Sequence, residues 1–128
     1  MIPFFLALKK NRVLTELDIS SQNIGVAGVE YLCLGLEANN SLRKLYWDNN
    51  NPTLQGYKRV LQAMDDCSLT IFPIPVEDLS NYMNSWDNIT RNEILSTIGQ
   101  IQSKISQKKE KVLQLVQLIL GNTSSIYF

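Results

Sequence analysis

The sequence contains no histidine and only two cysteines, Cys33 and Cys67. Without histidine the chain lacks the most common general base, so neither a Ser-His-Asp triad nor a Cys-His pair can be built. The two cysteines show no C-x-x-C spacing, which argues against the common zinc sites. We therefore expect no catalytic residues, no metal and no other cofactor, and we predict that the protein is not an enzyme.

An excess of charge and a long apolar run are also missing. The 12 lysines plus arginines equal the 12 aspartates plus glutamates in number, so no net field would attract nucleic acid or an anionic membrane. No apolar run approaches the roughly 18 residues of a membrane span, and the opening MIPFFLAL lacks the basic leader of a signal peptide. We expect no nucleic-acid partner, no membrane span and a cytoplasmic, reducing location in which Cys33 fills the core.

What the sequence does contain is a repeat. The stretch LRKLYWDNNNPTLQG (42–56) matches LTELDISSQNIGVAG, which begins 28 positions earlier, at leucine, asparagine and glycine positions, and LTIFPIP begins a third copy at Leu69. A pattern of this kind and period is typical of leucine-rich repeats, in which each unit is one strand and one helix. The predicted fold class is α/β: a short leucine-rich repeat solenoid of the ribonuclease-inhibitor type, with about three strands, outer helices, a helical cap and a long C-terminal helix.

The repeat pattern also predicts the division of the chain. We expect leucine-rich repeats over residues 1–76, a C-terminal cap and connection over 77–88, a long heptad helix over 89–121 and a tail over 122–128. Because the chain opens within a repeat helix, the strand at 14–19 would have an unpaired edge. We expect a fragment, either the C-terminal piece of a longer solenoid or a truncated reading frame.

Alternation along the predicted strands separates core residues from candidate contact residues. Trp47 takes an inward position and is expected to fill the core, while Asn23 and Asn51 are expected to bond the backbone where the chain leaves each strand. The outward residues would form the partner-binding candidates on the concave face. Glu16 could pair with Lys44 across the sheet, and Tyr46 is the best single contact candidate. These candidates are Glu16, Asp18, Lys44, Tyr46 and Asp48.

The third predicted strand ends the array. Pro73 and Pro75 are two residues apart, so their missing N–H groups would face one edge, which we expect to be the open edge. Beyond them Leu79, Tyr82, Met83 and Trp86 have helical spacing and would cover the end of the core.

A long helix is predicted after this cap. Thr90 and Glu93 match a capping box, and Gly121 would follow the last helical turn. Between them, apolar residues recur at gaps of three and four, which is typical of a coiled coil. This seam either packs on its own chain or pairs with another chain, and we favour a homodimer because a lone helix with such a seam needs a partner. The seam residues are Ile94, Ile98, Ile101, Ile105, Val112, Leu115 and Ile119, interrupted by Lys108.

The second and third copies resemble the end of the leucine-rich repeat domain of CARMIL proteins, scaffolds that regulate actin capping protein. Trp47 and Asp48, followed by the Phe-Pro-Ile-Pro segment 72–75, carry this resemblance. It implies a helical dimerisation domain after the repeats, partners in the actin capping machinery, and a location at the cytoskeleton or cell cortex. The family's membrane-binding domain and capping-protein-binding segment match nothing in these 128 residues, so uncapping activity is not implied.

Two functions follow from these features. The first is a non-enzymatic protein-interaction scaffold, part of an actin-cytoskeleton regulator that self-associates through its C-terminal helix. The alternative is a leucine-rich repeat regulator of a small GTPase, as some ribonuclease-inhibitor-like proteins are. That alternative would favour an acidic concave rim over many repeats, whereas charge is balanced here and the array is short.

Overall fold

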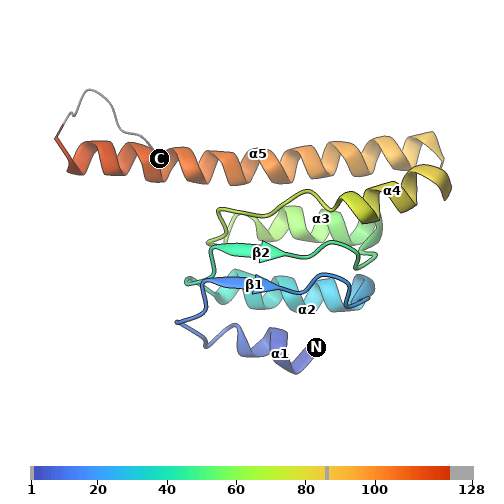
Figure 1. Cartoon of the computed structure of the whole chain (residues 1–128), viewed down its shortest axis with the longest axis horizontal. Coiled ribbons are helices and arrows are strands. Elements are labelled where there is room, and N and C mark those ends of the chain that lie inside the picture. Colours follow the sequence, from blue (N-terminus) through green and yellow to red (C-terminus); the bar gives the residue numbers. More distant parts are fainter. Residues whose placement is uncertain (1, 86, 122–128) are drawn as a thin grey trace.

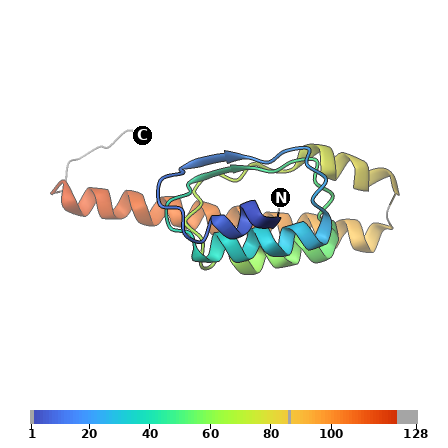
Figure 2. The same ribbon diagram turned by 90° about the horizontal axis from the view of Figure 1, so that it is seen from below.

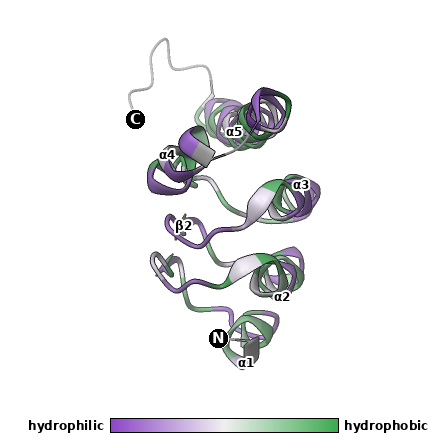
Figure 3. Cartoon of the chain, turned by 90° about the vertical axis from the view of Figure 1, so that its right-hand side faces the viewer, coloured by the Kyte–Doolittle hydropathy of each residue, from purple (hydrophilic) through white to green (hydrophobic). Residues whose placement is uncertain are grey.

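The structure, a computed structural model, describes residues 2–85 and 87–121. Three helices form one layer, two short strands form the other, and two further helices close one end of the stack (Figure 1). In Figure 3, α5 lies above α3 and α4 lies above the strand layer. The elements in chain order are α1 (Ile2–Ala7), β1 (Glu16–Asp18), α2 (Gly25–Ala38), β2 (Lys44–Tyr46), α3 (Thr53–Ala63), α4 (Val76–Ser85) and α5 (Asn88–Ile119).

The predicted fold class is wrong. The described chain is mostly helical, and its strands β1 and β2 are parallel segments of only three residues each. No third strand and no solenoid of the leucine-rich repeat type is seen in the described part of the chain. The register within the one sheet is the one that the 28-residue offset requires, with Glu16 opposite Lys44 and Asp18 opposite Tyr46.

The third predicted strand is lost because of how its prolines face. Ile71 forms a single bridge to Lys44, in which the Ile71 N–H donates to Arg43 and the Ile71 carbonyl accepts from Leu45. Since alternate residues of an extended chain face the same edge, Pro73 and Pro75 share the orientation of Ile71 and point toward β2. The expectation that they face the open edge is therefore wrong. Their missing N–H groups instead stop pairing with β2 itself.

The opposite edge of this segment faces α5. The side-chain amide of Gln102 donates to the carbonyl of Phe72 at 2.7 Å, which shows that the backbone of residue 72 points away from β2. Helix α4 follows this segment, and on it Tyr82 is buried and Leu79 packs against the core. Trp86, which was expected to join them, lies outside the described residues.

The 28-residue period recurs in the turns. The side-chain oxygens of Asn11 and Asn39, 28 residues apart, each accept from the backbone N–H groups two and three residues later, at 2.8–3.0 Å. After the strands, positive φ angles recur at Ser21 and Asn49, at Asn23 and Asn51, and at Gly25 and Thr53. Equal spacing in sequence therefore produces equal backbone turns at both ends of β1 and β2.

The core lies between the helix layer and the strand layer. Trp47 is 3% exposed, which confirms its predicted position, and its ring lies 5.6 Å from that of Tyr57 and 4.9 Å from that of Phe72. Gly35 allows α1 to approach α2, because a Cβ there would collide with the carbonyl oxygen of Phe5. Cys33 is fully buried, as expected of a core residue.

Helix α5 is one continuous helix of 32 residues, about 48 Å long at a rise of about 1.5 Å per residue. Its cap is Asp87, whose carboxylate accepts the N–H of Thr90 at 2.8 Å, so the predicted cap at Thr90 is wrong. At the other end Gly121 has a φ of +67°, as a residue following a helix often does. Figure 2 shows the last part of α5 extending beyond the strands and the other helices.

Candidate protein-interaction surfaces

The five partner-binding candidates on the strands do not all remain available. Glu16 and Asp18 are exposed, whereas Lys44, Tyr46 and Asp48 are half-buried. Glu16 and Lys44 are cross-strand neighbours, but their charged groups form no ion pair. Ser20 donates its backbone N–H to Asp18 at 2.9 Å, and this bond lowers the pKa of the Asp18 carboxyl. The strands therefore bring the predicted residues together, yet build no enclosed site from them.

Asp48 has a structural role that its sequence position did not reveal. Its two carboxylate oxygens accept the backbone N–H groups of Glu77 at 2.9 Å and Asp78 at 3.1 Å, in the first turn of α4. A carboxylate at a helix N-terminus satisfies N–H groups that have no partner within the helix and interacts favourably with the helix dipole. Asp48 thus fixes α4 to the end of β2, and it is not a free contact for a partner.

A ladder of polar side chains continues this connection. Asn50 is buried, and its side-chain oxygen accepts from the N–H groups of Gln22 at 3.1 Å and Ile24 at 3.3 Å. One unit further along, the carboxylate of Asp78 accepts from the N–H groups of Asn50 and Asn51, both at 3.0 Å. These side chains connect successive turns at a spacing of 28 residues.

The repeat pattern predicts that Asn51 bonds the backbone, but the residue that does so is Asn50, one position earlier. The carboxamide of Asn50 donates to the carbonyls of Ile19 at 2.9 Å and Trp47 at 2.7 Å. The side chain of Asn51 instead accepts from the Tyr82 hydroxyl at 2.9 Å. The asparagine three residues after the last inward strand position was the pattern that would have identified Asn50. Gln22 occupies this position in the first copy, and that difference favoured the wrong alignment.

The first half of the predicted dimer seam is covered by its own chain. Ile94, Ile98, Ile101 and Ile105 are all buried and belong to the same core as the residues of α3. Polar contacts continue the packing, since Lys104 pairs with Asp65 at 2.8 Å. These four isoleucines are not available to a second chain, and the coiled coil predicted from their spacing is not formed in the described structure.

Lys108 marks the point where α5 leaves the body of the protein. Its ammonium group donates to the carbonyl of Cys67 at 2.7 Å, in the turn after α3. Beyond it, the apolar residues of α5 are largely uncovered, and Ile119 is 80% exposed. We call residues 112–120 the arm. Its exposed apolar side chains are Val112, Leu115, Leu118, Ile119 and Leu120.

The ionisable groups of the chain show no activated nucleophile. Burial raises the pKa of the Cys33 thiol to about 12, so the thiol carries its proton at neutral pH. Among residues 2–85 and 87–121, no three acidic or cysteine side chains gather as a metal site would require. In the same part of the chain, no helix is both long enough and apolar enough to cross a bilayer.

The chain is similar to a Rho GTPase-activating protein and to a capping protein linker. The chain is 32% identical over 108 residues to the Rho GTPase-activating protein gacW of Dictyostelium discoideum, which covers 82% of this chain and 10% of that protein. It is 31% identical over 80 residues to capping protein, Arp2/3 and myosin-I linker protein 3 from human and from mouse, which covers 62% of this chain and 6% of each of those proteins. No protein-family model matches the chain.

These similarities support the CARMIL resemblance in part. The stretch of 80 residues agrees with a CARMIL-like relationship, while the correspondence to the end of a repeat domain stays a prediction. The chain spans a tenth or less of the length of the relatives it matches. Both kinds of relative are consistent with a protein-interaction role connected with the cytoskeleton.

Proposed function

We propose that this chain is a non-enzymatic protein-interaction module of an actin-cytoskeleton regulator, which forms a homodimer through the arm of α5. Its setting would be the cytoplasm, at the cytoskeleton or cell cortex. The absence of histidine and the high pKa of the buried Cys33 thiol support a non-enzymatic role. The similarity to the capping protein linker supports the connection with actin.

The exposed arm is the observation that carries self-association. Val112, Leu115 and Ile119 follow one another at gaps of three and four, so they lie along one face of the helix. All three are more than half exposed, and burying one such side chain fully contributes about 1.5–3 kcal/mol. A second copy offers an identical apolar face, and symmetric pairing of this kind is the commonest form of oligomer.

Sedimentation velocity tests this pairing. The wild type is expected to sediment as a dimer at tens of micromolar, and Leu115→Asp with Ile119→Asp is expected to sediment as a monomer with an unchanged circular dichroism spectrum. Ile89→Asp is a matched control, because Ile89 is 74% exposed at the opposite end of the same helix. A monomeric wild type, or an Ile89→Asp variant that dissociates equally, would contradict the proposal.

Two partner classes follow from the relatives' names. The first is the actin capping machinery, which the similarity to the linker protein supports. The second is a Rho-type GTPase, because the similarity to gacW extends over more of this chain. Titration of the purified chain with capping protein and with a Rho GTPase, in parallel, separates the two. Binding to the GTPase alone would replace the first assignment by the second.

A further inference from the structure

The balanced total charge conceals a separation of charge within the folded chain. Six cationic side chains come together at the end of the stack where the strands begin and where α1, α2 and α3 end. We call this the cationic end. It consists of Lys9, Lys10, Arg12, Arg43, Lys109 and Lys111.

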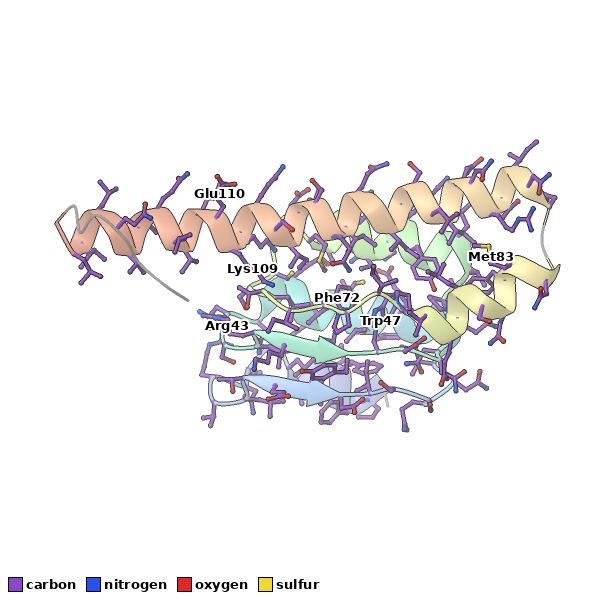
Figure 4. All side chains as sticks on the ribbon, turned by 45° about the horizontal axis from the view of Figure 1, so that its top comes forward. Arg43, Trp47, Phe72, Met83, Lys109 and Glu110 are labelled. Carbon is purple, nitrogen blue, oxygen red and sulfur yellow. The ribbon has the colours of Figure 1, made fainter. Side chains whose placement is uncertain are left out.

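Contacts between four separate segments place these residues together. The loop before β1 contacts the loop before β2, since Asn39 donates to the carbonyl of Asn11 at 3.0 Å. The latter loop contacts the segment after α3, where Thr70 donates its N–H to Arg43 at 2.8 Å. That segment in turn contacts α5 through Lys108. Figure 4 shows Arg43 and Lys109 at this same end of the molecule.

None of the six cations forms an ion pair within the described chain, where the paired cations are Lys58, Arg59 and Lys104. The guanidinium groups of Arg12 and Arg43 donate to carbonyls in their own loops. The side chains of Lys9, Lys10, Lys109 and Lys111 make no hydrogen bond in the described structure. The carboxylates near this end that form no ion pair in the described chain are Glu16, Asp66 and Glu110, so the six cations outnumber them.

An apolar pocket of about 350 Å³ opens beside one of these cations, Lys109. It lies between the segment after α3 and the outer part of α5, and its lining residues are Thr70, Ile71, Lys109, Val112 and Leu113. Charge and apolarity therefore meet at one surface.

We propose that the cationic end docks on an anionic lipid surface. Each lysine near an anionic bilayer strengthens membrane binding by about fivefold. Apolar side chains beside the lysines enter the boundary between headgroups and acyl chains. The cations come from three segments, the loop before β1, the loop before β2 and helix α5, and this spread suits a broad array of headgroups better than a single peptide. Nucleic acid offers no counterpart for the apolar pocket.

Vesicle co-sedimentation tests the proposal on the full chain. Binding is expected to vesicles that contain about one-third phosphatidylserine and not to pure phosphatidylcholine, and raising the salt to about 0.5 M should release the protein. Lys9→Gln, Lys10→Gln, Lys109→Gln and Lys111→Gln combined should weaken binding by several hundredfold, at about fivefold each.

A matched pair of single substitutions shows whether binding depends on the cationic end or on positive charge anywhere on the protein. Lys109→Gln should weaken binding about fivefold, whereas Lys58→Gln, at a side chain 60% exposed on α3, should leave it unchanged. Equal effects of the two variants, equal binding to neutral vesicles, or no binding at low salt would overturn the proposal. Tighter binding to a duplex oligonucleotide or to polyglutamate than to the anionic vesicles would overturn it as well.

Discussion

Asp48 and Asp78 bond each other's backbone segments across the junction between β2 and α4. The Asp48 carboxylate accepts the N–H of Asp78 at 3.1 Å, and the Asp78 carboxylate accepts the N–H groups of Asn50 and Asn51 at 3.0 Å. Each carboxylate therefore accepts from backbone N–H groups at or near the other aspartate. This reciprocal arrangement holds the helical cap on the stack, and Asp78 is only 2% exposed within it.

Removal of Asp78 is expected to cost more stability than removal of Asp48. Asp78→Ala leaves two backbone N–H groups without a charged acceptor, at a cost of about 2–4 kcal/mol. Asp48→Ala removes a helix cap, at a cost of about 1–2 kcal/mol. Urea unfolding monitored by circular dichroism measures both. Asp66→Ala, at an exposed carboxylate, is the control and should change stability by less than about 0.5 kcal/mol.

Trp47→Ala is expected to destabilise the protein by about 3–5 kcal/mol, the usual loss for a large buried aromatic side chain. The neighbouring substitution Tyr46→Ala serves as the control, because Tyr46 faces the other side of β2 and is only half-buried. It should cost clearly less in the same urea titration. If the two losses were equal, the assignment of the two faces of the strand would be wrong.

Thr53 has a φ of +62°, a conformation that Gly25 adopts one unit earlier with a φ of +63°. A left-handed conformation costs a residue with a side chain about 1–2 kcal/mol, and glycine avoids this cost. Glycine also loses more conformational entropy on folding, which offsets about 0.5–1 kcal/mol of the gain. We expect Thr53→Gly to stabilise the protein by about 0.5–1 kcal/mol. The reverse change, Gly25→Thr, should destabilise it, and thermal unfolding of both variants checks the sign.

Stability should fall at alkaline pH because Cys33 is buried. Its pKa is raised from an ordinary value of 9.0 to about 12, so between these values the folded state keeps a proton that the unfolded state has lost. Stability is therefore fully present below about pH 9 and decreases as pH rises toward about 12. Cys33→Val should remove the part of this decrease that begins near pH 9. Burial also raises the pKa of Tyr57 above its ordinary 10.0, so a decrease at higher pH should remain in the variant. An unchanged pH profile of unfolding in Cys33→Val would contradict the prediction.

The features that sequence analysis found depend on short-range periodicity. The offset of 28 residues between copies was sufficient to place Trp47 in the core and to set Glu16 opposite Lys44. It did not reveal which edge Pro73 faces, because an alternating pattern is the same for either orientation and only the bridge at Ile71 decides between them.

The features that were missed depend on contacts between distant residues. Asp48 is an outward strand residue by pattern, and nothing local to it indicates that the first turn of α4 lies within hydrogen-bonding distance. In α5 the apolar spacing is the same before and after Lys108, so the sequence could not show where burial ends. The length of α3 decides this, because α5 is covered only as far as the turn that follows α3.

The first half of α5 is fixed to the body by Ile94, Ile98, Ile101 and Ile105, and the arm continues it without a break. The direction in which the apolar face of the arm points is therefore fixed by the packing of these four isoleucines in the core. Inserting one residue between Lys108 and Val112 would turn the apolar face of the arm by about 100° relative to the body, since a helix has about 3.6 residues per turn. Inserting seven would leave the face within about 20° of its original direction and move it about 10 Å further out. The orientation and reach of whatever the arm holds can thus be adjusted separately, by the number of residues added at one exposed position.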